Sequence, residues 1–233
     1  MKLTPVNVTS DPAYEDALRQ YVSNNDVHHI LTKYNVTLKE LIDLCGGIQP
    51  GTTGFRMEIH TSSEADVIHA RIFSDSYDLV RSIDFESKVI FNYFMYVRNQ
   101  KMGIGTNLLI TQVKAARKHC FTKFKTIASA ADEEDNISKA GYYCWGRLGY
   151  VMRADEEYDF NNWLQRWNRH EKTLFELLSS DDGREVWRRY GYTWNGVFLL
   201  DDNTESMNNL KKYLESKGRK TLFEPGSGQV ESK

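Results

Sequence analysis

Two glycines, Gly103 and Gly105, stand between a strand-like and a helix-like segment, and this placement suggests a binding site. The segment before them, residues 89–97, is apolar or aromatic on both parities, which predicts a central strand covered on both faces. From Gly105 to His119 the apolar residues recur at helical spacing. Such a turn aims free backbone N–H groups at one point, and glycine lets a phosphate approach them closely. The same pattern also suits a tight strand-to-helix turn that binds nothing.

The glycine spacing excludes two common phosphate-binding loops. The dinucleotide motif G-x-G-x-x-G requires a third glycine where this chain has Leu108, and no Gly-Lys-Ser/Thr triplet of a P-loop occurs. Residues 100–105, QKMGIG, instead match the pattern (Q/R)-x-x-G-x-(G/A) and resemble the GNAT superfamily of acyl-CoA N-acyltransferases. Residues 136–150, NISKAGYYCWGRLGY, resemble the second sequence block of that family. The matched region is therefore residues 89–150.

The resemblance implies an activity and a binding site for the co-substrate. The activity is direct transfer of an acyl group, with acetyl-CoA as the expected donor, to an amine. A base removes the proton of the amine and an acid protonates the departing thiolate. The implied acyl-CoA contacts come from the end of the strand, the glycine loop and one asparagine. They are Met95, Tyr96, Val97, Gln100, Lys101, Met102, Gly103, Ile104, Gly105, Thr106 and Asn136.

The general acid implied by the resemblance is a tyrosine, and two ways of counting lead to different residues. Counting four residues back from Gly149 reaches Trp145, whose indole N–H is too weak an acid. Counting six residues forward from Asn136 reaches Tyr142, nearly one helical turn from Trp145. We therefore expect Tyr142 to be the catalytic acid, with Tyr143 as the second candidate. The alternative is that all three rings only pack in the core.

The general base is less well marked, because residues 89–97 contain no Asp, Glu or His. Glu86 and Asp84 directly precede this segment, whereas Glu58 and His60 lie on an earlier predicted strand. We take Glu86 as the first catalytic candidate for this role. Each of these residues also suits a solvated position on a strand, and a partly deprotonated amine or a water relay needs none of them.

Three other motifs have alternative interpretations. The side chains of the adjacent His28 and His29 point about 100° apart on a helix, and no acidic residue stands at i+4 spacing to complete a metal site. We therefore expect no metal site there. The acidic residues 132–135 either favour a helix N-terminus or attract a cationic amine. The basic and aromatic residues of 184–194 either contact RNA or an anionic substrate, or form an amphipathic helix and strand whose rings lie in the core, and we favour the second interpretation.

The periodicity along the chain predicts a mixed α/β (α+β) fold. We expect an antiparallel meander of strands at 55–60, 67–73 and 79–85, preceded by helices at 11–21, 26–33 and 37–44. The strand–glycine loop–helix–strand crossover of residues 89–129 makes its two strands parallel. Later elements are helices at 136–150, 161–178 and 207–214 and a strand at 197–200. The whole order is GNAT-like, with a helical C-terminal elaboration.

These elements suggest the division of the chain. We expect one GNAT-like domain over residues 1–218, with the acyl-CoA core at 89–150 and the elaboration at 151–218. Residues 219–233 have no apolar periodicity and are expected to be a disordered tail.

The composition limits the classes of partner. The 30 Lys and Arg residues against 32 Asp and Glu give a net charge of -2, which argues against a general nucleic-acid coat. The three cysteines, Cys45, Cys120 and Cys144, form no C-x-x-C, which argues against a disulfide framework or a zinc site. No signal-like or membrane-spanning apolar run occurs. We therefore expect a cytoplasmic protein without membrane or metal.

Two functions of different classes follow. The first is an acyl-CoA-dependent N-acyltransferase whose amine acceptor is a small molecule, a protein or an RNA; the sequence decides neither the acceptor nor the oligomeric state. The second is a non-catalytic GNAT-like protein that binds CoA or a macromolecular partner. Trp145 and the absence of a carboxylate in residues 89–97 motivate the second function.

Overall fold

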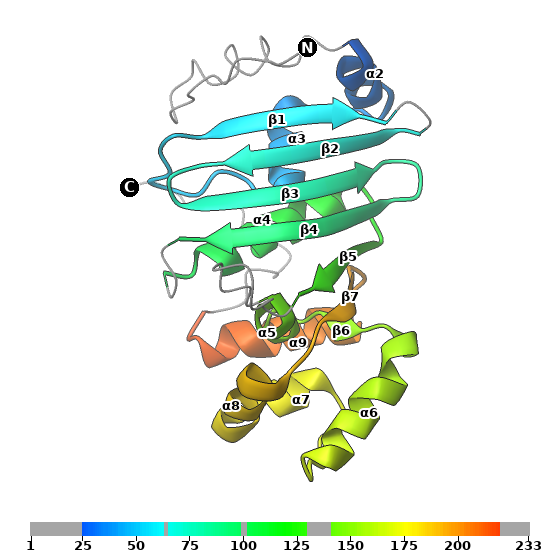
Figure 1. The fold of residues 1–233 in the computed structure, drawn as a ribbon. Coiled ribbons are helices and arrows are strands. Elements are labelled where there is room, and N and C mark those ends of the chain that lie inside the picture. The colour runs from blue at the N-terminus through cyan, green and yellow to red at the C-terminus, as the bar shows by residue number, and fades with distance from the viewer. Residues whose placement is uncertain (1–24, 63–64, 99–101, 130–140, 220–233) are drawn as a thin grey trace, which may run out of the picture. The chain divides into compact units, whose positions relative to one another are not determined.

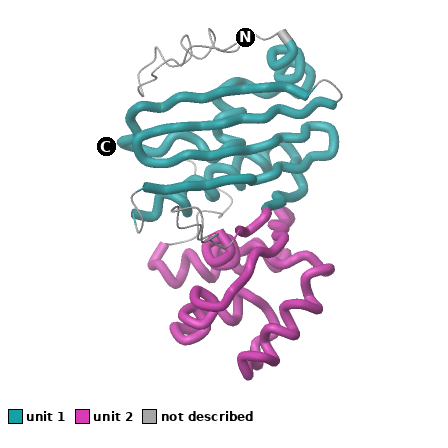
Figure 2. The backbone as a smooth tube through the Cα atoms, viewed as in Figure 1, with its two compact units in different colours: residues 1–126 teal, residues 127–233 magenta. Residues whose placement is uncertain are grey.

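The structure is a computed structural model that describes residues 25–62, 65–98, 102–129 and 141–219 (Figure 1). The chain divides into two compact units, Met1–Thr126 and Ile127–Lys233, and each is described by itself (Figure 2). The predicted helix at 11–21, the residues Gln100, Lys101 and Asn136, and residues 220–233 of the expected tail lie outside the described residues. The expectation of a single domain over residues 1–218 stays a prediction.

The sheet of the first unit contains the predicted meander and crossover. Strands β1 (Arg56–Thr61), β2 (Val67–Phe73), β3 (Tyr77–Asp84) and β4 (Val89–Val97) pair antiparallel in chain order. Helix α4 (Ile104–Lys118) then leads to β5 (Lys123–Ala128), which pairs parallel with β4. Helix α2 (Asn25–Lys33) contacts β1, and α3 (Leu38–Cys45) and α4 lie against one face of the sheet (Figure 1).

The core of the first unit lies between that face and helices α3 and α4. Alternate strand residues point toward the helices, as the period of two predicts. Its buried residues include Met57, Ile68, Ile72, Leu79, Ile83, Ile90, Leu41, Leu44, Leu109 and Val113. One polar pair is buried among them: the amides of Asn92 and Gln112 exchange two hydrogen bonds of 3.0 and 2.9 Å. Gln112 also donates to the Leu44 carbonyl, so β4, α4 and α3 are joined at one point.

Helix α3 begins at a capping box and is tied to α4 by its glutamate. The Thr37 hydroxyl accepts from the Glu40 N–H, and Glu40 accepts from the Thr37 N–H. Lys118 Nζ lies 2.6 Å from Glu40 Oε1. The Lys118 hydrogen bond, followed by the Thr37 N–H, lowers the pKa of Glu40 from 4.5 to about 2.

We therefore expect Glu40→Gln to lower the free energy of unfolding at neutral pH. A lowered pKa contributes stability that is present above the unfolded value and lost as the pH falls through the folded value. Because Lys118 is exposed, we expect a loss of about 1 kcal/mol, and the difference from wild type shrinks from about pH 5 towards pH 2. Urea unfolding at a series of pH values measures it. A difference that stays constant with pH would assign the effect to geometry instead of charge.

Strand β4 differs from the prediction that both of its faces are covered. Its first half is largely covered, but the side chains of Tyr93 and Phe94 are 53% and 37% exposed. The register explains this change, because Arg81 pairs with Asn92 and Val80 with Phe94, which leaves Tyr93 as an extra residue on β4. Such a bulge bends the strand locally.

The second unit is mainly helical. It contains α5 (Gly141–Arg147), the short strand β6 (Val151–Met152), the 3₁₀ turn η1 (Ala154–Glu156), α6 (Glu157–Arg166), α7 (Leu174–Ser179), α8 (Asp181–Tyr190), β7 (Trp194–Leu199) and α9 (Glu205–Ser216). Strands β6 and β7 pair antiparallel. Helix α5 contacts α7, α8 and α9.

The prediction of one helix at 161–178 is wrong. The structure has two helices there, α6 and α7, because Asn168 takes a left-handed conformation with φ 50° and Thr173 caps a new helix. The Thr173 hydroxyl accepts from the Glu176 N–H at 3.2 Å. The helix favoured within residues 184–194 is confirmed as α8, which begins earlier than expected, at Asp181. Its N-cap is Ser180, whose hydroxyl accepts from the Gly183 N–H.

The rings of residues 184–194 mainly supply the core, as favoured from the sequence. Trp187 and Trp194 are fully buried, and Trp187 makes edge contacts with Phe160, Trp163 and Tyr192. Tyr190 is an exception, because it is exposed and stacks on Trp167 with ring centroids 3.9 Å apart. The predicted mixed α/β class is confirmed, with its antiparallel meander, its parallel crossover and its largely helical C-terminal part.

Candidate functional site

Helix α4 begins at a glycine and without a side-chain cap. Gly103 is the N-cap of α4 with φ 76° and ψ 6°, a left-handed conformation that side-chain-bearing residues seldom adopt. No side chain caps this helix, and the first helical bond runs from the Asn107 N–H to the Gly103 carbonyl. The N–H groups of Ile104, Gly105 and Thr106 precede that bond, so they have no intrahelical partner. The turn thus offers a row of N–H donors at the positive end of a helix dipole.

Gly105 brings the start of α4 close to the end of β4. A Cβ at this position would lie 3.6 Å from Met95 Cε and 3.7 Å from Val97 Cγ2. Thr106 is buried, whereas Met102 is 73% exposed. The structure therefore brings Met95, Val97 and Gly105 together, and their role as acyl-CoA contacts stays a prediction.

The end of β4 lies outside the described parallel ladder. Within the first unit, residues 89–92 of β4 pair with residues 123–126 of β5. Beyond the bulge at Tyr93, residues 94–97 continue to pair with β3. The second half of β4 therefore pairs with β3 and lies beyond the described pairing with β5. It includes the predicted contacts Met95, Tyr96 and Val97.

Arg81 supports the bulge from inside the core, and the sequence analysis missed it. This β3 side chain is 2% exposed, and its Nη1 donates to the carbonyls of Phe94 at 2.5 Å and Val80 at 3.0 Å. A buried charge needs such partners. The signal in the sequence is a lone charge on the inward parity of a strand, between Leu79 and Ile83.

Tyr142 lies on the first turn of α5 with its hydroxyl engaged. Its Oη donates to the Arg188 carbonyl at 2.6 Å. Its own carbonyl accepts from Trp187 Nε1 at 3.1 Å and Trp194 Nε1 at 2.8 Å. Burial raises the pKa of Tyr142, and the nearby Arg188 opposes that shift. The phenol is therefore fully protonated at neutral pH, as a general acid must be.

Tyr143 and Trp145 have different surroundings on the same helix. The Tyr143 oxygen accepts from Arg147 Nη1 at 3.1 Å and from Arg188 Nη2 at 2.9 Å. Trp145 is buried, with its ring 4.8 Å from that of Tyr150. Trp145 is thus a core residue, and Tyr143 is an acceptor between two guanidinium groups.

Of the candidate bases, Glu86 and Asp84 lie at the end of β4 that is remote from the glycine turn. Glu86 is exposed in the turn before β4, and Asp84 accepts hydrogen bonds from the N–H groups of Glu86 and Ser87. The length of β4 separates Glu86 from Gly103 by about 25 Å of extended chain. Glu58 and His60 point from β1 to the face of the sheet opposite Met57 and Ile59. The structure therefore does not bring Glu86 to the glycine turn, and its role as base stays a prediction.

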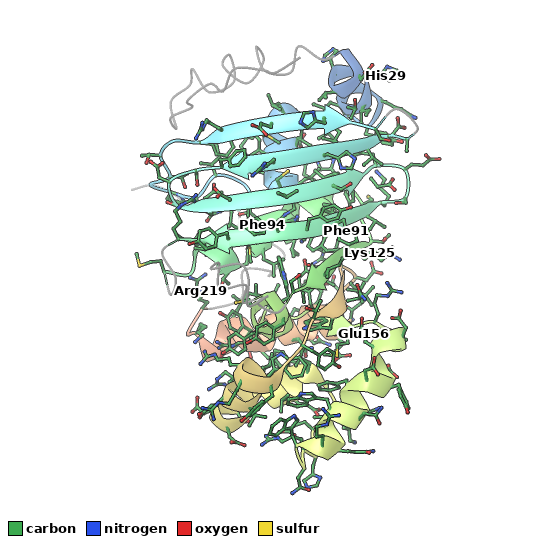
Figure 3. The ribbon with its side chains drawn as sticks, viewed as in Figure 1. His29, Phe91, Phe94, Lys125, Glu156 and Arg219 are labelled. Atoms are coloured by element: carbon green, nitrogen blue, oxygen red, sulfur yellow. The ribbon has the colours of Figure 1, made fainter. Side chains whose placement is uncertain are left out.

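A cavity of about 410 Å³ lies on the same face of the sheet as the outward residues of β3–β5. Asp84, Phe91, Tyr93, Lys123 and Lys125 are among its lining residues (Figure 3 labels Phe91 and Lys125). The rings of Phe91 and Tyr93 stack with centroids 4.3 Å apart. Of the candidate bases, Asp84 is the one that lines this cavity.

In the described ranges, no three His, Cys, Asp or Glu residues gather as a metal site would require. None of the helices in the described part of the chain is long and apolar enough to cross a bilayer.

Comparisons with known proteins give a distant structural likeness. No protein-family model and no curated protein matches the chain. Among solved structures, the chain is similar to a tandem GNAT protein from the clavulanic acid biosynthesis pathway, determined without AcCoA. This likeness has a TM-score of 0.31 and 12% sequence identity, and it covers 66% of this chain. The chain spans 45% of the length of that protein. A likeness of this size carries no information on activity or substrate.

Proposed function

We propose that this chain is an acyl-CoA-dependent N-acyltransferase of GNAT type that moves an acetyl group to an amine. The observation that carries the proposal is the left-handed Gly103 at the uncapped start of α4, directly after a bulged β4. It supports binding of a diphosphate by the N–H groups of Ile104, Gly105 and Thr106. In the proposal, residues 100–106 hold the diphosphate of acetyl-CoA.

The pantetheine arm of acetyl-CoA is assigned to the second half of β4. The bulge at Tyr93 and the four-residue ladder to β5 support this assignment, because they set residues 94–97 apart from the paired half of the strand. The backbone of Met95, Tyr96 and Val97 would pair with the amides of the arm, as another strand does. Asn136 is proposed as a further contact on the resemblance alone.

The proposed reaction breaks the thioester C–S bond and forms a C–N bond to the acceptor. Tyr142 supplies the proton that the departing thiolate takes up, and Tyr143 is the second candidate. Because the Tyr142 O–H is directed at the Arg188 carbonyl, it must turn away from that carbonyl to reach a thiolate. The amine proton leaves to water or to a carboxylate such as Glu86. The acceptor is a small molecule, a protein or an RNA, and the reduced, unspaced cysteines support a cytoplasmic location.

A second function, a non-catalytic GNAT-like protein that binds CoA or a macromolecular partner, is favoured by a specific observation. The hydroxyl groups of Tyr142 and Tyr143 both take part in hydrogen bonds that hold α8 against α5, which is a structural role. Such a protein would keep the glycine turn and lose the transfer.

Thiol release from acetyl-CoA with a panel of amines separates the two functions. The proposal predicts free thiol that forms only when both acetyl-CoA and one class of amine are present. Binding of acetyl-CoA without thiol release for any amine would favour the non-catalytic protein. The panel should include polyamines, amino acids, aminoacylated RNA and peptides with free amino termini, because the sequence does not choose among them.

A further inference from the structure

The second unit contains a cavity of about 360 Å³ that is lined by residues of α5, α7, α8 and α9. Four of its lining residues are cationic: Arg147, Arg184, Lys212 and Lys217. None of the described residues that line it carries a carboxylate. Four like charges around one hollow repel each other, and an anionic ligand removes that repulsion.

The two arginines of this cationic cavity are held in place by neighbouring rings and backbone carbonyls. Arg147 lies between two rings, with its guanidinium carbon 5.5 Å from the Tyr143 centroid and 5.3 Å from that of Tyr213. Arg184 Nη1 donates to the carbonyls of Leu178 and Ser179 at the end of α7. A guanidinium has five donors, and the described bonds use one in Arg147 and three in Arg184. Both groups therefore retain donors for a ligand.

The other polar groups of the cationic cavity are less suited to bind an anion. The hydroxyl groups of Ser179 and Ser216 donate to carbonyls of their own helices at 2.7 Å. Asp181 pairs with Arg184, but its side chain is 99% exposed, so solvent screens the pair. The cavity remains cationic, and its recognition groups are two arginines and two lysines.

We propose that this cationic cavity binds the diphosphate or triphosphate group of a small molecule. Arginine forks match phosphate oxygens in a bidentate way, and lysines add point charges. Four cations balance the charge of two or three phosphate groups better than that of a single carboxylate. The volume lies at the lower end of the range for small-molecule sites, which suits a compact ligand more than a folded partner.

Inorganic tripolyphosphate is the probe, and its binding to the full chain is measured by calorimetry. We expect binding below millimolar concentration by wild type, and a loss of about 30- to 100-fold in Lys212→Gln/Lys217→Gln, because two charge-assisted contacts are removed. Both lysines are exposed, so the folded structure should be kept. Lys211→Gln is the matched control, since it removes a charge from the same helix without touching the cavity and should leave binding unchanged.

Three outcomes would overturn the proposal. Wild type fails to bind tripolyphosphate at millimolar concentration, or Lys211→Gln weakens binding as much as the variants at the cavity do. The third is a single-stranded RNA that binds far more tightly than tripolyphosphate and loses affinity in the same variants, which would assign the surface to a nucleic acid. Gly103→Val separates this proposal from acyl-CoA binding, because tripolyphosphate should bind that variant as it binds wild type.

Discussion

Gly103→Val is expected to abolish acetyl-CoA binding. Gly103 has φ 76° at the start of α4, and valine takes that conformation only with strain. The turn would rearrange, and the N–H groups of Ile104 and Gly105 would no longer point at one diphosphate. Hydrogen bonds to a charged group are worth about 1.5–3 kcal/mol each, so the loss of two weakens binding by about 100-fold or more.

Gly51→Val is the matched control for this experiment. Gly51 also has φ 76°, and no atom lies within 4 Å of the position that its Cβ would take. The strain of the backbone is therefore similar, at about 1–2 kcal/mol, but the site is untouched. We expect Gly51→Val to bind acetyl-CoA as wild type does. Equal loss in both variants would mean that global stability, and not the turn, controls binding.

Tyr142→Phe is expected to lower turnover by about 10²- to 10⁴-fold, the usual contribution of a positioned proton donor. The variant keeps the ring that lies beside Trp187 and loses the hydrogen bond to the Arg188 carbonyl. That loss should lower the free energy of unfolding by about 0.5–1.5 kcal/mol. The KM for acetyl-CoA should change little, since one hydroxyl is removed, and steady-state thiol release separates kcat from KM.

Two neighbouring variants distinguish chemistry from packing. Tyr143→Phe removes an acceptor of two guanidinium groups, and we expect lower stability with a smaller loss of rate. Trp145→Phe should act through packing alone because the indole is buried. If Tyr142→Phe keeps the wild-type rate, Tyr142 has no part in proton transfer. If the rate falls in all three variants in proportion to their loss of folding stability, this helix has a structural role.

The glycine turn could be predicted from the sequence because its signals are local. Two glycines between an apolar strand and a periodic helix mark a tight turn, and the structure has that turn, with Gly103 in a left-handed conformation. The parallel pairing of β4 and β5 followed from the length of the crossover. These parts of the fold depend on neighbouring residues.

Features that depend on tertiary contacts could not be predicted. The bulge at Tyr93 is set by the register with β3 and by the buried Arg81, which are far from it in sequence. As a result, the aromatic second half of β4 looked like a buried strand but is partly exposed. The break between α6 and α7 depends on Asn168, whose left-handed conformation leaves little trace in apolar periodicity.

The catalytic assignments are the part that sequence counting supports least. Tyr142 was chosen by spacing from Asn136, and that spacing says nothing about where its hydroxyl donates. In the structure the Tyr142 hydroxyl donates to the Arg188 carbonyl. Glu86 lies at the opposite end of β4 from the glycine turn. An acid or base role depends on where the side chain meets the substrate, and the spacing of residues in the sequence does not give that position.

Amide hydrogen exchange with and without acetyl-CoA tests the central claim most directly, because the claim concerns backbone N–H groups. We expect acetyl-CoA to slow exchange at residues 103–106 and 95–97, with little change in α2 or α9. Protection at these residues that disappears in Gly103→Val and persists in Gly51→Val would support the proposed site. Unchanged exchange at residues 95–106 under saturating acetyl-CoA, or protection confined to the second unit, would contradict it.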